Sequence, residues 1–436
     1  MKRMREKYSV DIEDKGWMSL DNAAKIFPPV ISKSLSPVFR IGAVLAEPVR
    51  ISALRKAVEV SSQRFPYYLT SLRKGFFWYF LEYDSNIRPQ LVKEENRPLI
   101  AFPAKQGSDA MFRVVVKEEM LSVEFLHVLT DGGGGLEFFR TLLVTYLRNC
   151  GYDIPYSEGI IDPSSAVRPS ETEDSYNRYF KKEVPKPPKL ENAWHLPFRA
   201  KEKGYLDIIQ GEIPVSDIKR LSKDKNVTIT EYLASAYLFC LQEIWKKDRS
   251  RDKNIIRLEI PVNMRRSFPS NTMRNFSLFV LPELDMRLGD YSFEEILKHV
   301  HNYMQIETDK KVLSKVIRRN VKPEKNIFVR TTPVFIKDII LSAAYKKHGT
   351  TKYSGVLTNV GIAKMPEEAV PHIETMLMLA PPPVSQLNVS CGMLSYRDSL
   401  CISFSNNCGN TELERNFFSF LAGKGLKVRM LKNIWK

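Results

Sequence analysis

The residues best suited to chemistry are a histidine and an aspartate four positions apart, His127 and Asp131, followed by four glycines. The alternating apolar residues of 121–126 predict a half-buried strand that ends at His127. An imidazole with an ordinary pKa of about 6.5 is a competent base at cellular pH, and glycines let a bulky substrate come close. The pattern is therefore compatible with an acid–base site. From these residues alone, an interior histidine beside a flexible glycine turn is the favoured interpretation.

Other catalytic and phosphate-binding motifs are missing from the sequence. A dinucleotide-binding loop starting at Gly132 would need a glycine where Glu137 stands, and no Gly-Lys-Ser/Thr follows. The Gly-x-Ser-x-Gly elbow of serine hydrolases is also absent. Five cysteines without a Cys-x-x-Cys pair predict free thiols. His299 and His301, the one close histidine pair, would point to different helix faces, so we expect no metal site.

The charge balance allows an anionic partner, although charge alone favours the simpler interpretation of a soluble protein with a basic surface. Lysine and arginine exceed aspartate and glutamate to give a formal net charge of +16, which attracts nucleic acid, anionic membranes or phosphate-bearing molecules. The densest basic run is residues 310–325, which we interpret as a solvated helix face. It lacks the interleaved aromatic residues of a single-strand-binding platform, so we expect no nucleic acid partner.

Length and composition predict a globular protein of two or three folding units. Strands and helices alternate along the chain, which is typical of an α/β or α+β fold. No apolar run reaches the roughly 18 residues of a membrane span, and no apolar stretch follows the basic start at residues 1–7, so we expect a cytoplasmic protein. Seven prolines mark residues 151–205 as a crossover between an N-terminal subdomain, 1–150, and a C-terminal one, 206–436.

Periodicity and turn residues predict the individual elements. Ser52 is the expected N-cap of the first long helix, and residues 67–83 read as a hairpin that turns at Lys74-Gly75. Strands are expected at 38–46, 112–116, 121–126, 206–212, 255–261, 387–392 and 400–404, and helices at 136–148, 215–221, 230–245 and from 411 onward.

The His127–Asp131–Gly132 pattern resembles the His-x-x-x-Asp-Gly signature of the chloramphenicol acetyltransferase-like superfamily. A second similarity is the strand-end segment Pro261-Val262-Asn263-Met264-Arg265, followed by Asn275-Phe276. Further matches bring the chain nearest to the alcohol acetyltransferase branch and extend the resemblance over residues 15–425. They are Trp17, Leu20-Asp21, Arg64-Phe65-Pro66, Lys74-Gly75-Phe76-Phe77-Trp78 and Thr358-Asn359-Val360-Gly361.

The resemblance implies two acyltransferase subdomains, each a mixed sheet with helices, and an active-site tunnel where they meet. It implies that His127 is the general base that deprotonates an acceptor hydroxyl, with acyl-CoA, acetyl-CoA in the first place, as the donor substrate and no resident cofactor. Asp131 would form a buried, bidentate ion pair with Arg265 and lock the halves together, with Arg266 as the competing partner. Gly132 would leave room beside the base. The residues that bind coenzyme A are not assigned.

Some features depart from the superfamily pattern. Leu126 stands where condensation domains carry a second histidine, which disfavours peptide-bond formation, and the Asp-Phe-Gly-Trp motif of the plant branch is absent. The alternative function is a non-catalytic member that serves as a binding or partner-recognition module. The acceptor, the acyl chain length and the oligomeric state stay open, as does peripheral membrane contact through residues 310–325 if the acceptor is lipidic.

Overall fold

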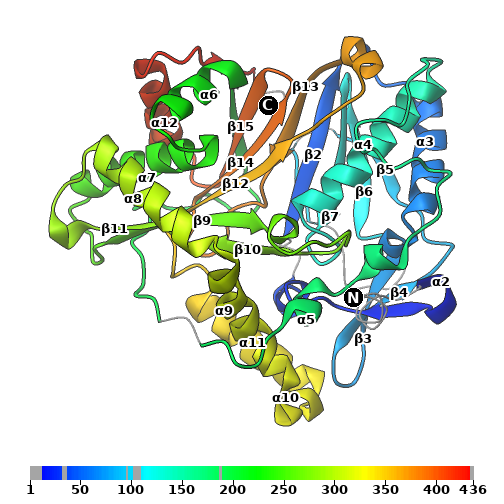
Figure 1. The fold of residues 1–436 in the computed structure, drawn as a ribbon, viewed down its shortest axis with the longest axis horizontal. Coiled ribbons are helices and arrows are strands. Elements are labelled where there is room, and N and C mark those ends of the chain that lie inside the picture. Colours follow the sequence, from blue (N-terminus) through cyan, green and yellow to red (C-terminus); the bar gives the residue numbers. More distant parts are fainter. Residues whose placement is uncertain (1–11, 32–36, 95–96, 102–109, 186–188, 433–436) are drawn as a thin grey trace.

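The protein folds into two α/β halves that lie side by side in Figure 1, the N-terminal half in blue and cyan and the C-terminal half in green, yellow and red. The computed structural model describes residues 12–31, 37–94, 97–101, 110–185 and 189–432. The basic start of the chain, residues 1–7, lies outside this range. The α/β prediction with two subdomains is confirmed.

The N-terminal half is built on a five-stranded sheet in the order β13-β2-β7-β6-β5. All neighbours are antiparallel except the parallel pair β5–β6. Strand β13, at one edge of this sheet, comes from far along the chain, beyond the expected subdomain boundary at residue 206. The strands are β2 (Val38–Leu45), β5 (Gln90–Lys93), β6 (Phe112–Lys117), β7 (Met120–Leu126) and β13 (Ile373–Leu379), with helices α3 (Ile51–Arg64) and α4 (Gly132–Asn149) packed together beside them.

Strand β7, which leads to His127, is buried along its whole length, so the prediction of a half-buried strand is wrong. Its one acid, Glu124, is fully buried between two arginines. Arg40 Nε donates to Glu124 Oε1 at 3.0 Å, and Arg113 Nε donates to Oε2 at 2.7 Å. Burial pushes the pKa of Glu124 upward, but the two guanidinium groups outweigh it and hold that pKa below its ordinary value. The acidic position in the alternation therefore belongs to a charged cluster inside the protein rather than to a solvent-exposed face.

Two helix starts differ from the sequence predictions. Helix α3 begins at Ile51, with Arg50 in the capping position, so Ser52 is not its N-cap. Helix α4 begins at Gly132 rather than at residue 136, because the Asp131 side chain caps it. The predicted hairpin is confirmed as β3 (Thr70–Lys74) and β4 (Tyr79–Tyr83), which form a small sheet with β1 (Trp17–Ser19).

The C-terminal half is built on an eight-stranded mixed sheet in the order β10-β9-β12-β14-β15-β8-β16, with β11 also paired to β9. Strands β9, β12 and β14 run parallel, and the other neighbours are antiparallel. The strands are β8 (Asp207–Pro214), β9 (Ile255–Asn263), β10 (Ser277–Val280), β11 (Glu283–Asp285), β12 (Gly355–Ile362), β14 (Val389–Tyr396), β15 (Ser399–Asn406) and β16 (Arg429–Met430).

Helices cover this second sheet and extend beyond it. Helix α7 is fixed at its start by a capping box between Thr228 and Glu231. A helical lobe, drawn in yellow in Figure 1, projects from the lower side and consists of α9, η6, α10 and α11. The helices are α6 (Val215–Asp224), α7 (Ile229–Lys247), α8 (Phe293–Glu307), α9 (Lys310–Val321), η6 (Lys322–Lys325), α10 (Ile327–Thr331), α11 (Val334–His348) and α12 (Glu412–Gly423).

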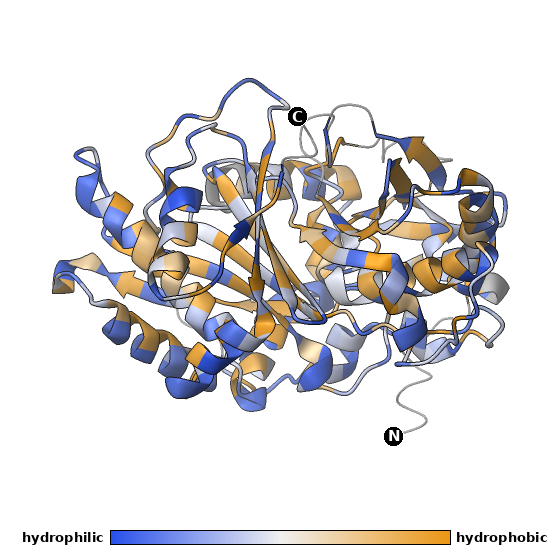
Figure 2. Ribbon diagram, turned by 90° about the horizontal axis from the view of Figure 1, so that it is seen from above, coloured by the Kyte–Doolittle hydropathy of each residue, from blue (hydrophilic) through white to orange (hydrophobic). Residues whose placement is uncertain are grey.

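Each half has its own apolar core, and apolar residues concentrate along the strands in Figure 2. The halves meet where β14 crosses β13. A Cβ atom on Gly392 would lie 2.8 Å from the Met378 carbonyl oxygen, closer than real contacts allow, so only glycine fits there. The described part of the proline-rich segment 151–205 holds η3 (Pro169–Thr172) and α5 (Ser175–Tyr179) and is otherwise irregular.

Candidate active site

His127 stands directly after β7, and main-chain and ring contacts hold it in place. Its backbone N–H donates to the Pro37 carbonyl at 2.8 Å. Its ring stacks on Phe27, with centroids 5.3 Å apart, and meets Phe39 edge-on at the same distance. The side chain is partly exposed. Packing therefore fixes the imidazole plane, and the residue as a whole is only partly buried.

The C-terminal half determines which ring nitrogen carries the proton. His127 Nδ1 lies 3.0 Å from Asn275 Oδ1, while Asn275 Nδ2 donates to the His127 carbonyl at 3.1 Å and to Asp21 Oδ2 at 3.1 Å. A carbonyl oxygen only accepts, so the amide nitrogen must face it and the amide oxygen must face the ring. Nδ1 therefore donates its proton to Asn275, and the lone pair of the neutral imidazole lies on Nε2.

Asp131 joins the two halves next to the histidine. Its Oδ1 accepts from the backbone N–H groups of Gly133 and Gly134, both at 3.1 Å. Its Oδ2 accepts from Arg265 Nη1 at 2.9 Å and from the backbone N–H of Phe276 at 2.8 Å. The carboxylate thus caps α4 with one oxygen and binds the other half with the second.

The bidentate geometry expected for this ion pair is wrong, because Arg265 gives Asp131 one nitrogen only. Its Nε donates to the Thr272 carbonyl at 3.0 Å, and its Nη2 donates to the Arg274 carbonyl at 2.6 Å. The guanidinium therefore fixes the loop after β9 as well as the carboxylate. Arg266, the competing candidate, is exposed and has no ion pair with Asp131 among the described residues.

The charge state of Asp131 follows from these contacts. Burial alone would raise its pKa, but the Arg265 charge and the surrounding N–H donors lower that pKa below its ordinary value. Asp21 shows the opposite balance. Burial raises its pKa, and Arg274, whose Nε lies 3.8 Å from Oδ2, offsets that only in part.

Packing requires glycine at position 134, the third residue after Asp131. A Cβ on Gly134 would lie 2.3 Å from Thr130 Oγ1 and 2.4 Å from the Met273 carbonyl oxygen, which leaves no room for any side chain. A Cβ on Gly132 would meet Val360 at 3.1 Å. The space at Gly132 is therefore bordered by β12 of the other half rather than left open.

Sequence reasoning assigned no role to three residues that complete the site. Asn275 orients the imidazole, Asp21 anchors the Asn275 amide, and Arg274 lies beside Asp21. Asp21 and Asn275 both belong to segments that resemble the superfamily. Their mutual contact spans 254 residues, so no local pattern could have linked them.

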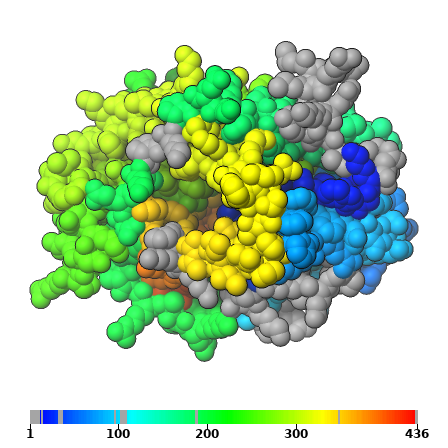
Figure 3. Space-filling view, turned by 90° about the horizontal axis from the view of Figure 1, so that it is seen from below, coloured from blue at the N-terminus to red at the C-terminus, as the bar shows by residue number. Residues whose placement is uncertain are grey.

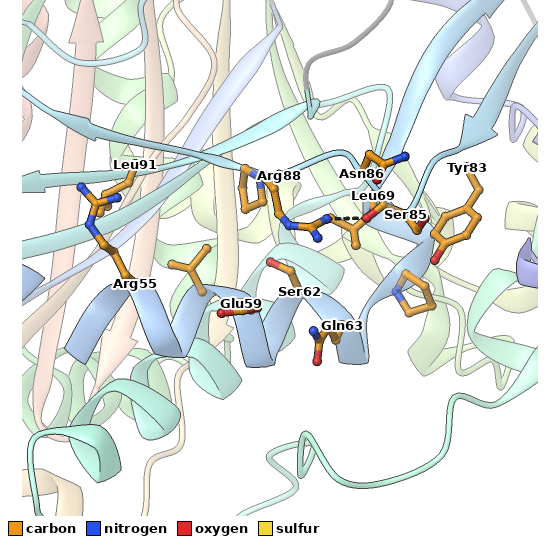
Figure 4. Close-up of a pocket in the computed structure, with 13 residues that line it drawn as sticks. Arg55, Glu59, Ser62, Gln63, Leu69, Tyr83, Ser85, Asn86, Arg88 and Leu91 are labelled. Atoms are coloured by element: carbon orange, nitrogen blue, oxygen red, sulfur yellow. Dashed lines mark hydrogen bonds between the residues drawn. The ribbon is translucent and has the colours of Figure 1, made fainter. Parts of the chain in front are cut away.

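A separate pocket lies on the N-terminal half, between α3 and residues 83–91 (Figure 4). Its volume is about 710 Å³, and its charged lining side chains are Arg55, Glu59 and Arg88. His127 and Asp131 do not line it. It is therefore distinct from the histidine site.

Comparison with known proteins agrees with this architecture. Residues 201–376 match the family model of alcohol acetyltransferases. The solved structure of TRI101 from Fusarium sporotrichioides, complexed with coenzyme A and T-2, is similar over 95% of this chain and 99% of that chain, with 11% identity and a TM-score of 0.58. The chain has the chloramphenicol acetyltransferase-like fold. The superfamily prediction is thereby confirmed at the level of the fold.

Other structures with this fold include different kinds of protein. The starter condensation domain of rhizomide synthetase, in complex with C8-CoA, covers 94% of this chain and 95% of its own, with 13% identity and a TM-score of 0.60. Polyketide synthase associated protein 5 from Mycobacterium tuberculosis covers 92% and 96%, with 13% identity and a TM-score of 0.56. The sequence matches no curated protein.

Two further observations bear on what the site could hold. Across the described ranges, His, Cys, Asp and Glu side chains nowhere gather in a group of three or more that could bind a metal ion. No helix within those ranges combines the length and apolar character needed to cross a bilayer.

Proposed function

We propose that the protein is an acyl-CoA-dependent O-acyltransferase that uses His127 as general base toward an alcohol. The observation that carries this proposal is the contact with Asn275, which places the His127 proton on Nδ1 and leaves Nε2 to accept another. The fold supports the same reading, because TRI101 and the rhizomide synthetase domain were solved with coenzyme A or an acyl-CoA.

In the proposed reaction, His127 Nε2 takes the proton of the acceptor hydroxyl as its oxygen attacks the thioester carbonyl carbon. A carbon–oxygen bond forms, and the carbon–sulfur bond then breaks. The leaving thiolate takes the proton back from Nε2, so the products are an ester and free coenzyme A. No covalent enzyme intermediate is required. Asn275 accepts from Nδ1 throughout and stabilises the imidazolium that forms in between.

Asp131 and Arg265 are assigned a structural role in this scheme. Both side chains are occupied by contacts that join α4 to the loop after β9. They hold His127, which belongs to one half, against Asn275, which belongs to the other. We assign the acetyl group and a small-molecule alcohol as the substrates to test first, because the alcohol acetyltransferase model matches residues 201–376.

The test is release of free coenzyme A from acetyl-CoA by the purified chain, with short, long and aromatic alcohols as acceptors. His127→Ala should abolish alcohol-dependent release while the variant stays folded, and His299→Ala, at an exposed histidine on α8, should keep it. Full activity in His127→Ala would refute the base assignment. Failure of the parent chain to bind any acyl-CoA would favour the non-catalytic binding module instead.

A further inference from the structure

The helical lobe exposes an unusual amount of apolar surface. Of the 21 large apolar side chains that the described residues expose, eight fall between residues 327 and 341, on α10 and the first half of α11. Phe328 is 78% exposed and Ile339 is 69% exposed. Exposed apolar side chains concentrated in one segment in this way point to an interaction site. The eight are Ile327, Phe328, Val329, Phe335, Ile336, Ile339, Ile340 and Leu341.

The tip of the β3–β4 hairpin extends this surface. The Phe76 carbonyl accepts from the backbone N–H of Val334 at 2.8 Å, and Lys337 Nζ donates to the Phe77 carbonyl at 2.7 Å. The hairpin tip therefore lies against the start of α11. Phe76 and Trp78 are themselves exposed, so the tip adds two aromatic rings beside the exposed residues of the lobe. Figure 3 shows the yellow lobe between the green C-terminal half and the blue hairpin.

The lobe that carries these apolar side chains has an excess of positive charge. Residues 310–341 contain nine lysines and arginines but only two acids. Both acids are paired with lysines of the N-terminal half, since Glu324 contacts Lys25 at 2.5 Å and Asp338 contacts Lys74 at 2.8 Å. Exposed cations on and next to α10 are Arg330 on the helix itself and Lys322 of η6, which contacts α10.

We propose that this face, comprising α10, the first half of α11 and the hairpin tip, docks onto an anionic phospholipid bilayer. Aromatic and aliphatic side chains next to lysine and arginine are the composition that binds at the boundary between headgroups and acyl chains. A second copy of the chain fits the same face poorly, because self-association would oppose two strongly positive surfaces.

Docking in this orientation brings the histidine site toward the bilayer. Ser342 Oγ on α11 donates to the Pro29 carbonyl at 2.7 Å, and Phe27, two residues earlier, stacks on His127. The segment from Phe27 to Pro29 thus lies between the docking face and the imidazole. The docking proposal itself does not depend on acyl transfer, because it follows from exposure and charge alone.

The experiment is flotation of the full chain with vesicles of phosphatidylcholine alone and of phosphatidylcholine mixed with phosphatidylserine. We expect binding to the mixed vesicles, weakened by added salt, and at least tenfold weaker binding to the neutral ones. The double variant Phe328→Ser, Ile339→Ser should bind the mixed vesicles at least about tenfold more weakly than the parent, because two large apolar contacts are lost. Leu288→Ser, at a site 79% exposed in η5 (Met286–Leu288), is the matched control and should bind normally.

Charge and self-association are tested separately. Lys322→Glu with Arg330→Glu should remove the preference for phosphatidylserine. The proposal is overturned if the parent chain fails to float with either vesicle, or if the Phe328→Ser, Ile339→Ser variant floats as well as the parent. It is also overturned if light scattering shows that the parent is a dimer and that this variant is a monomer, since the face would then bind a second copy. Circular dichroism and melting of each variant should match the parent, because all the altered side chains are exposed.

Discussion

Replacing Asp131 should separate its two structural tasks, capping α4 and joining the halves. In Asp131→Asn, the remaining oxygen can still accept from Gly133 and Gly134, but an amide group then faces the N–H donors of Arg265 and Phe276. In Asp131→Ala, both sets of hydrogen bonds are lost. The difference in the free energy of unfolding between the two variants therefore measures the contribution of the α4 cap. The loss of stability in the asparagine variant alone measures the contribution of the contacts that join the halves.

The magnitudes follow from burial. Removing one partner of a buried ion pair costs about 3–5 kcal/mol, and Arg265 is 17% exposed, so we expect about 3 kcal/mol for Asp131→Asn. Loss of the cap in Asp131→Ala adds about 1 kcal/mol. Either cost is a large share of the 5–15 kcal/mol by which proteins are typically stable.

Urea unfolding of the parent, Asp131→Asn, Arg265→Met and the double variant gives the coupling energy, which we expect to be about 2–3 kcal/mol. Asp162→Asn is the control, because that carboxylate only closes its own surface turn with Ser164. The pKa of Asp131 is lowered in the folded protein, so its contribution is complete above the unfolded value and disappears as the pH falls through the folded value. Equal midpoints for Asp131→Asn and Asp162→Asn, or a coupling energy of zero, would refute the junction.

Three other variants test separate features. Asn275→Ala should lower kcat about 100-fold with little change in KM, because the imidazole loses the acceptor that orients it; steady-state kinetics with unchanged kcat would exclude this role. Gly134→Ala should lower the free energy of unfolding by about 3 kcal/mol, because the added methyl group clashes with Thr130. Thermal melting measures this loss. Gly423→Ala is the control and should be neutral or stabilising, because a Cβ added there meets nothing within 4 Å. Burial raises the pKa of Glu414 to about 7, so the free energy of unfolding should fall by roughly 3 kcal/mol as the pH rises from 5 to 8. Glu414→Gln should remove this pH dependence. Identical profiles of stability against pH for the two proteins would contradict the raised pKa.

The sequence predicted the elements around His127 because their signals are local. The strand before it and the helix after it follow from alternation and helical periodicity, and the Asp131–Gly132 pattern indicated the superfamily. The prediction failed where a distant residue decides the outcome. Glu124 alternates like an exposed residue, yet Arg40, 84 positions away, keeps it inside the protein. Asn275 faces His127 across 148 residues, and its contact depends on how the two halves dock.

The position of β13 in the first sheet has a consequence for synthesis. Strand β2 pairs with β7 on one side, but its other partner begins at Ile373. At about 5–20 residues per second, a ribosome reaches that strand roughly 12–50 s after it has completed β7. Until then the nascent chain carries β2 as an apolar strand with an open hydrogen-bonding edge, which is the kind of surface that invites pairing with other chains. The half that contains His127 is therefore open to pairing with other chains until β13 has been made, and slower elongation prolongs that interval.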